Sequence, residues 1–402
     1  MPSINKSLVR GSLILLVAFN LYNFLNFIFH FSMARFLSVA DYGVLLTLYS
    51  IIYLFGVFSE SIQIVIVKYS SKENDSGKLK NLLKRSLKKS FFVSIILFLL
   101  YLLIAIPLAI LLKIEYPLLA LTGLMILLFL IVPANRGMLQ GKKRFKSLGF
   151  NMISEALTKL ALAIFFVYIG WRVYGAIIAT VLGVLISLLF SFVSLKDIMK
   201  SKEKRVDTED IYEYTKPAFV INLAILLFYS VDVIIARIFF SEFVAGSYAI
   251  ASILAKTIFM GTQPISRAMF PLSAENHSDN KKSENILLNS FAIILVGVVI
   301  ALVLFYFFPD FIVHVFSGKE ILEAVSILFY LGIAIGLFSF ASLILLYKLS
   351  VGKIKGYPYL FLLIFFEIVL LCYFSNDLSQ FSIAFITSAA VFLGGVVFLV
   401  GE

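Results

Sequence analysis

Long apolar runs separated by short charged segments dominate this chain. Each run is about 20 residues long, which is the length that an α-helix needs to cross a bilayer. Their continuity differs from the period-two alternation of a transmembrane β-barrel. The pattern therefore predicts an all-α membrane fold with about twelve transmembrane helices, at 11–33, 42–67, 90–112, 116–135, 150–171, 173–195, 214–236, 243–266, 287–309, 321–347, 357–375 and 378–400.

The first apolar run carries polar residues, and several of them recur 202 positions later. The matching positions are Asn20 with Asn222, His30 with Asp232, and Arg35 with Arg237. Six helices separate the two copies, so the second half enters the membrane in the same sense as the first, as a parallel repeat. We expect two six-helix lobes, at residues 1–200 and 201–402, joined by a charged linker at about 196–216.

Basic residues orient the predicted helices. Of the 34 lysines and arginines, 27 lie in the N-terminal tail and in alternate loops, and Arg136 is counted here with the loop after the fourth helix. Basic residues concentrate in the cytoplasmic loops of membrane proteins. The pattern predicts a multi-pass protein of the cell membrane with both termini in the cytoplasm.

Composition agrees with this picture, since 61% of the residues are hydrophobic, 14% are charged and the mean hydropathy is +1.03. The single cysteine, Cys372, excludes a disulfide within the chain and disfavours thiol chemistry. The chain has no Walker lysine loop, His-Glu-x-x-His motif or nucleophile elbow. We therefore expect transport rather than catalysis, with no cofactor, no bound metal and no nucleic-acid partner.

Ionisable residues inside membrane spans are costly and are functional candidates by default. Four acids are interpreted as ion-coupling candidates for H⁺ or Na⁺, and two lysines as groups that could meet a phosphate in a substrate cavity. The acids are Asp232, Glu155, Glu60 and Glu367, and the lysines are Lys159 and Lys256. Two alternatives stay open: Asp232 could instead pair with Lys256 or Arg237, and Glu155 stands four residues before Lys159, the spacing of an intrahelical ion pair.

Polar residues on the first and seventh helices are candidates for a cavity wall. Asn20, Asn23 and Asn26 recur every three residues, and His30 follows four residues later. Together with Asn222 they could line a cavity or hold helices together by hydrogen bonds. Arg35 and Arg237 lie where their helices reach the outer face of the membrane, at the predicted outer mouth of the cavity. They could be anchors that extend their charge to the membrane surface, or they could capture an anionic group.

The loop at 68–89 carries eight basic residues. A basic loop on the cytoplasmic side ordinarily meets anionic lipid. The alternative is that it gathers the phosphorylated headgroup of a lipid substrate.

Three segments carry a resemblance to a known family. Residues 34–43 (ARFLSVADYG), residues 137–145 (GMLQGKKRF), and residues 232–237 (DVIIAR) with 245–248 (AGSY) are similar to recurrent segments of the Wzx-like lipid-linked oligosaccharide flippases. That family is part of a superfamily with the MATE multidrug exporters and the MurJ-type lipid II flippases. Together the segments extend over most of the chain.

The resemblance implies two six-helix lobes that form a V around a polar cavity. It also implies alternating access that moves a polyprenyl-(pyro)phosphate-linked oligosaccharide to the outer leaflet for surface polysaccharide biosynthesis. The positions on the family's cavity-facing helices are Asn20, Asn23, His30, Asn222 and Asp232. The expected partners are this substrate, membrane lipids and other glycan-assembly proteins, and the alternative is a MATE-like drug or metabolite:cation antiporter.

Overall fold

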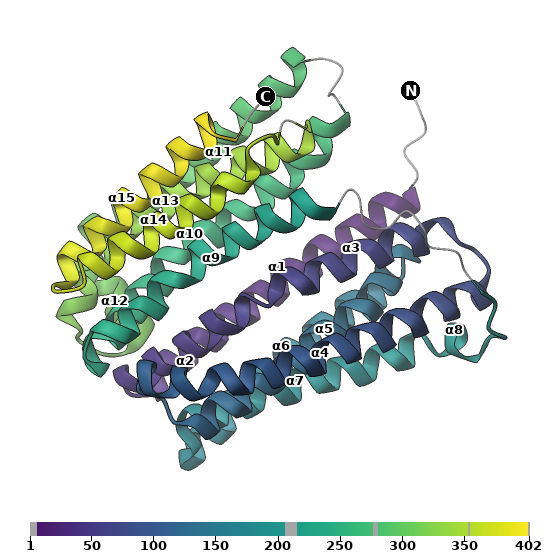
Figure 1. Ribbon diagram of the computed structural model, residues 1–402, viewed down its shortest axis with the longest axis horizontal. Coiled ribbons are helices and arrows are strands. Elements are labelled where there is room, and N and C mark those ends of the chain that lie inside the picture. Colours follow the sequence, from purple (N-terminus) through teal and green to yellow (C-terminus); the bar gives the residue numbers. More distant parts are fainter. Residues whose placement is uncertain (1–5, 206–214, 276–279, 353, 401–402) are drawn as a thin grey trace. The chain divides into compact units, whose positions relative to one another are not determined.

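The computed structural model describes residues 6–205, 215–275, 280–352 and 354–400 (Figure 1). These residues are almost entirely helical. The helices of the first half are α1 (Lys6–Phe36), α2 (Val39–Tyr53), α3 (Gly56–Lys72), α4 (Ser76–Leu112), α5 (Tyr116–Gly141), α6 (Phe145–Phe166), η1 (Val167–Trp171), α7 (Arg172–Ser194) and α8 (Lys196–Lys200). Those of the second half are α9 (Thr215–Phe239), α10 (Glu242–Glu275), α11 (Asn280–Phe307), α12 (Pro309–Ser317), α13 (Leu322–Ser350), η2 (Tyr357–Tyr359), α14 (Leu360–Tyr373) and α15 (Leu378–Phe398).

The predicted fold class is confirmed. Within the described residues, nine stretches are long and apolar enough to cross a membrane, and one of them, Phe145–Ser194, contains the two helices α6 and α7. The pair α2 and α3 passes the same test when its two helices, bent by 42°, are taken together, and Tyr357–Tyr373 is a shorter apolar stretch. Counted in this way, the described residues are consistent with about twelve spans, six in each half.

The chain forms two compact units. The first comprises Met1–Leu37 and Ile51–Glu213, and the second comprises Ser38–Ser50 and Tyr214–Glu402. Most of α2 therefore packs with the second half of the sequence, although it follows α1 directly. The sequence pattern does not reveal this arrangement, because an apolar run indicates a span but not the helices that the span contacts.

Two glycines bring α2 against α10 inside the second unit. A Cβ atom on Gly43 would lie 2.7 Å from the Cα of Gly246, and a Cβ on Gly246 would lie 2.1 Å from the carbonyl oxygen of Val39. The neighbouring side chain of Tyr42 is buried and meets Phe316 edge to face, with ring centroids 6.3 Å apart. The two backbones thus touch, and only residues without a Cβ fit there.

An aromatic core fixes the start of the second unit. The Phe228 ring on α9 stacks on Phe338 of α13 at a centroid distance of 4.7 Å, and it also packs against Phe385 and Phe392 of α15. Asp232 follows Phe228 by four residues, so both side chains lie on the same face of α9. The packing of Phe228 therefore turns Asp232 toward the interior of this unit.

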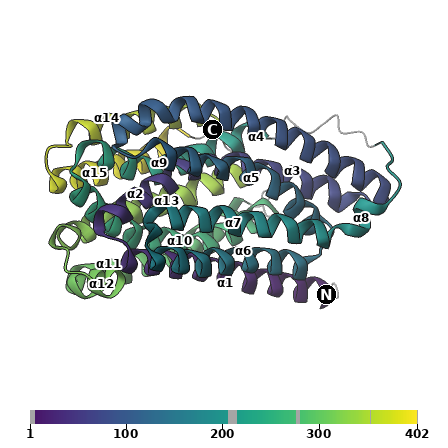
Figure 2. The same ribbon diagram turned by 90° about the horizontal axis from the view of Figure 1, so that it is seen from below.

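At one end of the first unit, the segment after α7 is anchored to the start of α4 (Figure 2). Lys204 donates its backbone N–H to the carbonyl oxygen of Gly77, and its ammonium lies 2.6 Å from Asp75. Glu203 lies 3.0 Å from Lys84. Hydrogen bonds from these lysines hold the pKa of Asp75 and of Glu203 below their ordinary values. The first part of the predicted charged linker is therefore bound to α4.

The glycine contact predicts the effect of one added methyl group. Gly246→Ala should destabilise the protein by about 1–3 kcal/mol, because the new Cβ meets backbone atoms that cannot move aside locally. Thermal unfolding of the detergent-solubilised protein measures this. Gly261→Ala on the same helix is the matched control, since a Cβ there meets nothing within 4 Å, and it should be neutral or stabilising by about 0.5–1 kcal/mol. Equal unfolding temperatures for the two variants would contradict the close contact.

Candidate functional site

The polar residues of α1 occupy two environments. Asn20 and Asn23 are exposed, whereas Asn26 is half-buried and His30 is buried. Seven residues make almost two turns, so His30 lies within about 20° of Asn23 around the helix axis. The same face of α1 is therefore open in its first part and covered further along. The predicted stripe of four polar residues is not one uniformly exposed wall.

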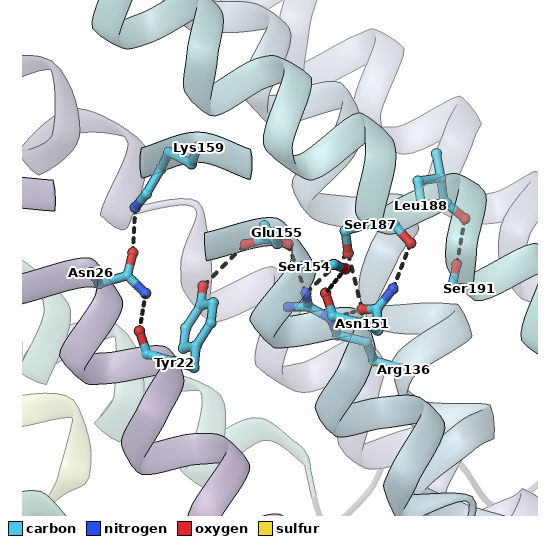
Figure 3. A network of polar contacts seen from close by, with 10 residues as sticks. All are labelled: Tyr22, Asn26, Arg136, Asn151, Ser154, Glu155, Lys159, Ser187, Leu188 and Ser191. Carbon is cyan, nitrogen blue, oxygen red and sulfur yellow. Dashed lines mark hydrogen bonds and ion pairs between the residues drawn. The ribbon is translucent and has the colours of Figure 1, made fainter. Parts of the chain in front are cut away.

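Two polar residues of α1 contact charged residues of α6 (Figure 3). Lys159 donates a hydrogen bond to Asn26, and its ammonium lies 4.4 Å from the centroid of the Phe29 ring. Tyr22 donates its hydroxyl proton to Glu155 Oε1 at 3.1 Å. Both charged side chains of α6 thus face α1.

Arg136 of α5 completes this network. Its Nη2 atom lies 2.6 Å from Glu155 Oε2 and donates to Ser187 Oγ of α7 at 3.1 Å, while its Nε donates to Asn151 Oδ1 at 2.8 Å. The guanidinium therefore joins three helices. We call Tyr22, Asn26, Arg136, Asn151, Glu155, Lys159 and Ser187 the α1–α7 network.

The assignment of Arg136 to a loop was wrong. The apolar run ends at Asn135, but α5 continues to Gly141 and carries Arg136 within the helix. The Glu155–Lys159 spacing also did not identify the main partner of Glu155, whose two oxygens meet Tyr22 and Arg136. A basic residue one position after an apolar run, before a helix-compatible sequence, is the signal that could have identified Arg136.

Close approach of α6 and α7 holds this network in place. A Cβ on Gly183 of α7 would lie 2.9 Å from the carbonyl oxygen of Glu155 and 3.1 Å from the Cβ of Lys159. Glycine at this position therefore lets α7 lie directly against the turn of α6 that carries both charges.

The second unit contains its own buried charged cluster. The Asp232 side chain on α9 is 0% exposed, and Lys256 of α10 lies 2.9 Å from its Oδ1. Tyr248 and Ser252, also on α10, donate to Oδ2 at 3.1 and 2.9 Å. The structure thus contains the Asp232–Lys256 ion pair that the sequence left open as an alternative. The Lys256 ammonium also lies 4.7 Å from the centroid of the Tyr229 ring.

Glu367 of α14 lies within electrostatic range of this cluster. Its side chain is 0% exposed, and neither carboxyl oxygen has a hydrogen-bond partner among the described residues. Asp232 and Lys256 are its charged neighbours. Burying an ionised carboxylate without a donor costs several kcal/mol, a cost that an added proton or cation removes. We call Asp232, Tyr248, Ser252, Lys256 and Glu367 the Asp232 cluster.

The remaining predicted site residues lie outside these two groups. Glu60 on α3 is exposed and Asn222 on α9 is half-buried. Arg35 is exposed with its Cζ atom 4.6 Å from the centroid of the Phe31 ring, whereas the Arg237 side chain is only 2% exposed and lies 3.4 Å from Glu242. The two arginines of the repeat therefore have different surroundings.

The chain is similar to a known protein family and to a membrane protein of known sequence. The model of a family described as "Polysaccharide biosynthesis protein" matches residues 8–277. An uncharacterized membrane protein of Methanocaldococcus jannaschii is 26% identical over 296 residues, which cover 68% of this chain and 69% of that protein.

Solved structures share the fold. An inward-facing multidrug resistance MATE family transporter of the MOP superfamily is similar with a TM-score of 0.76 and 14% identity, over 98% of each chain. The lipid II flippase MurJ in an inward closed conformation is similar with a TM-score of 0.71 and 14% identity, over 96% of this chain and 87% of that one. This chain thus shares the fold of these two membrane proteins.

The Arg136–Glu155 pair predicts a strong effect of removing one charge. Arg136→Ala leaves a buried carboxylate without its cation and should destabilise the protein by about 3–5 kcal/mol, whereas Arg136→Met combined with Glu155→Leu should recover most of that loss. Thermal unfolding in detergent measures both.

Arg144→Ala is the control, because the Arg144–Asp197 pair is more exposed and pairs of this kind contribute about 0–1 kcal/mol. A double variant as unstable as Arg136→Ala would contradict the role of buried charge.

Proposed function

The chain belongs to the polysaccharide biosynthesis protein family, and we propose that it is a flippase for a polyprenyl-(pyro)phosphate-linked oligosaccharide. The substrate moves from the cytoplasmic to the outer leaflet of the cell membrane by alternating access. A glycan with a charged phosphate cannot cross about 30 Å of hydrocarbon unaided. The multi-pass membrane fold, shared with transporters of the MOP superfamily, supports this proposal.

The charge balance of the two buried groups carries the proposal. The α1–α7 network contains the two cations Arg136 and Lys159 and the single acid Glu155. The Asp232 cluster contains two acids, Asp232 and Glu367, and the single cation Lys256. Charged groups inside membrane spans are expensive and mark ion or substrate pathways. The buried charges of the first unit thus favour binding of an anion, and those of the second unit favour binding of a cation.

We assign substrate contacts to the first unit. Lys159 belongs to the network that has more cations than acids. When its ammonium leaves Asn26, it is placed to meet the substrate phosphate. The exposed amides of Asn20 and Asn23 can hydrogen-bond sugar hydroxyls. Asn222 is the equivalent amide of the repeat.

We assign ion coupling to the second unit, with a proton as the coupling ion. Both oxygens of Asp232 already accept hydrogen bonds, and Lys256 supplies the cation beside it. Glu367 has two oxygens that accept no hydrogen bond from the described residues. A proton on Glu367 therefore neutralises its carboxylate without displacing a hydrogen-bond donor among the described residues.

Transfer between leaflets tests the flippase function directly. Vesicles containing the purified protein and a fluorescent lipid-linked glycan should show exchange of the label between leaflets. The exchange is measured as the fraction of the label that a quencher added outside the vesicles can reach. Vesicles without protein should show none, since the polar headgroup cannot enter the hydrocarbon. Export of cationic dyes without any glycan transfer would instead establish a MATE-like antiporter.

Glu367→Gln should remove the response of transport to an imposed pH gradient and leave the unfolding temperature unchanged, because no described residue donates a hydrogen bond to the carboxyl group. Asp232→Asn should lower stability by about 3–5 kcal/mol, because it breaks the buried ion pair of Lys256 by removing its direct partner. Transport rates in vesicles with and without the gradient measure the first effect, and thermal unfolding the second. Glu320→Gln, in an exposed loop position, is the control and should respond to the gradient as the wild type does. A Glu367→Gln variant that still responds would remove Glu367 from the coupling pathway.

A further inference from the structure

The first part of α4 carries a basic face that neither buried charge group uses. Lys84, Arg85, Lys88 and Lys89 are all exposed. Lys84 contacts Glu203, yet 64% of its side chain remains exposed. On the opposite side of the helix, Leu79, Leu82 and Leu83 are buried in the hydrophobic core of the first unit. The helix is thus held by its apolar face and presents its cations outward.

The basic face is continuous with the lipid-facing side of the same helix. Exposed side chains follow one another at helical spacing, from Lys84 and Lys88 to Phe92, Ile96, Leu99 and Leu103. Large exposed apolar residues begin at Phe91 and end at Leu111. At 1.5 Å per residue this stretch is about 30 Å long, which matches the hydrocarbon core of a bilayer.

This length fixes the depth of the cations. If Phe91 to Leu111 fills the hydrocarbon, Lys88 and Lys89 lie about 3–5 Å beyond its edge, and Lys84 and Arg85 about 9–11 Å. The headgroup layer occupies roughly 5–7 Å on each side of the core. Lys88 and Lys89 therefore lie in the headgroup layer, and Lys84 and Arg85 lie a few ångströms beyond it, from where their long side chains can reach back to the lipid phosphates.

The corresponding helix of the second unit shows that the fold does not require these charges. Residues 284–291 of α11 have the same pattern of exposed, half-buried and buried positions as residues 84–91 of α4, with Ser290 matching Ser90 and Phe291 matching Phe91. At the four exposed positions α11 carries Glu284, Asn285, Leu288 and Asn289. The four positions next to the lipid-facing stretch are thus all basic in α4 and carry no basic residue in α11, where the exposed Lys281 and Lys282 lie further from that stretch.

We propose that Lys84, Arg85, Lys88 and Lys89 form a docking surface for anionic phospholipids of the leaflet that adjoins the start of α4. The acyl chains lie along Phe92 and Ile96, and the phosphate groups meet the four cations. Clusters of Lys and Arg beside a transmembrane helix attract anionic headgroups in this way. The surface recruits negatively charged lipid to the first unit and not to the equivalent helix of the second.

Tryptophan quenching tests the proposal. The chain has a single tryptophan, Trp171, so Trp171→Phe combined with Phe92→Trp places one reporter beside the basic face. The same background with Ala292→Trp places the matched reporter beside the non-basic face of α11. Each protein is reconstituted in phosphatidylcholine vesicles in which about a tenth of the lipid is brominated phosphatidylglycerol or brominated phosphatidylcholine.

Brominated phosphatidylglycerol should quench the Trp at position 92 about two-fold more than brominated phosphatidylcholine, and high salt should reduce the excess. The reporter at position 292 should show no such excess. A variant in which all four basic residues are replaced (Lys84→Gln, Arg85→Gln, Lys88→Gln and Lys89→Gln) should lose the excess quenching by brominated phosphatidylglycerol at position 92. Quenching by brominated phosphatidylcholine should stay unchanged, which shows that the variant is folded and inserted.

Three results would overturn the proposal. The first is equal quenching by the two lipids at position 92, and the second is the same phosphatidylglycerol excess at position 292. The third is loss of the excess on adding a small amount of polyprenyl diphosphate, which would assign the surface to the transported substrate instead of bulk phospholipid.

Discussion

A charge buried among apolar helices must find its partner inside the protein, because the surrounding hydrocarbon offers none. This constraint ties the helices of each unit together. Glu155 of α6 takes a proton donor from α1 and a cation from α5, and Asp232 of α9 takes a cation and two hydroxyl donors from α10. The apolar runs place the helices in the membrane, and these polar pairs, together with the glycine and aromatic contacts, fix which helices lie together.

The two halves of the repeat share helices and differ in side chains. Arg35 is exposed and Arg237 is buried, although the repeat places them at equivalent helix ends. His30 of α1 corresponds to Asp232 of α9, which has become the centre of the charged cluster in its unit. α4 and α11 present the same exposed positions, basic in one and non-basic in the other. The duplicated fold supplies the scaffold, and substitutions at equivalent positions give each unit its own chemistry.

The spans could be predicted from the sequence because hydrocarbon thickness sets the length of an apolar run. The partners of polar residues could not. Arg136 was assigned to a loop because the apolar run stops one residue earlier, although the helix does not. The spacing of Glu155 and Lys159 describes neighbours on one helix, whereas Arg136 reaches Glu155 from another. Likewise, no local pattern shows that α2 packs with the second unit, since that depends on a contact between Gly43 and Gly246, about 200 residues apart.

The opposite charge bias of the two groups has a consequence for coupling. If an anionic headgroup binds beside Lys159 and a proton binds Glu367, each event brings its own unit closer to neutrality. Under the proposed function, an ionised Glu367 carboxylate and the net positive charge of the α1–α7 network each favour a conformation in which that group meets water, because burial penalises net charge. Binding of each proposed ligand would lower the cost of covering its group again, which is the thermodynamic condition for alternating access.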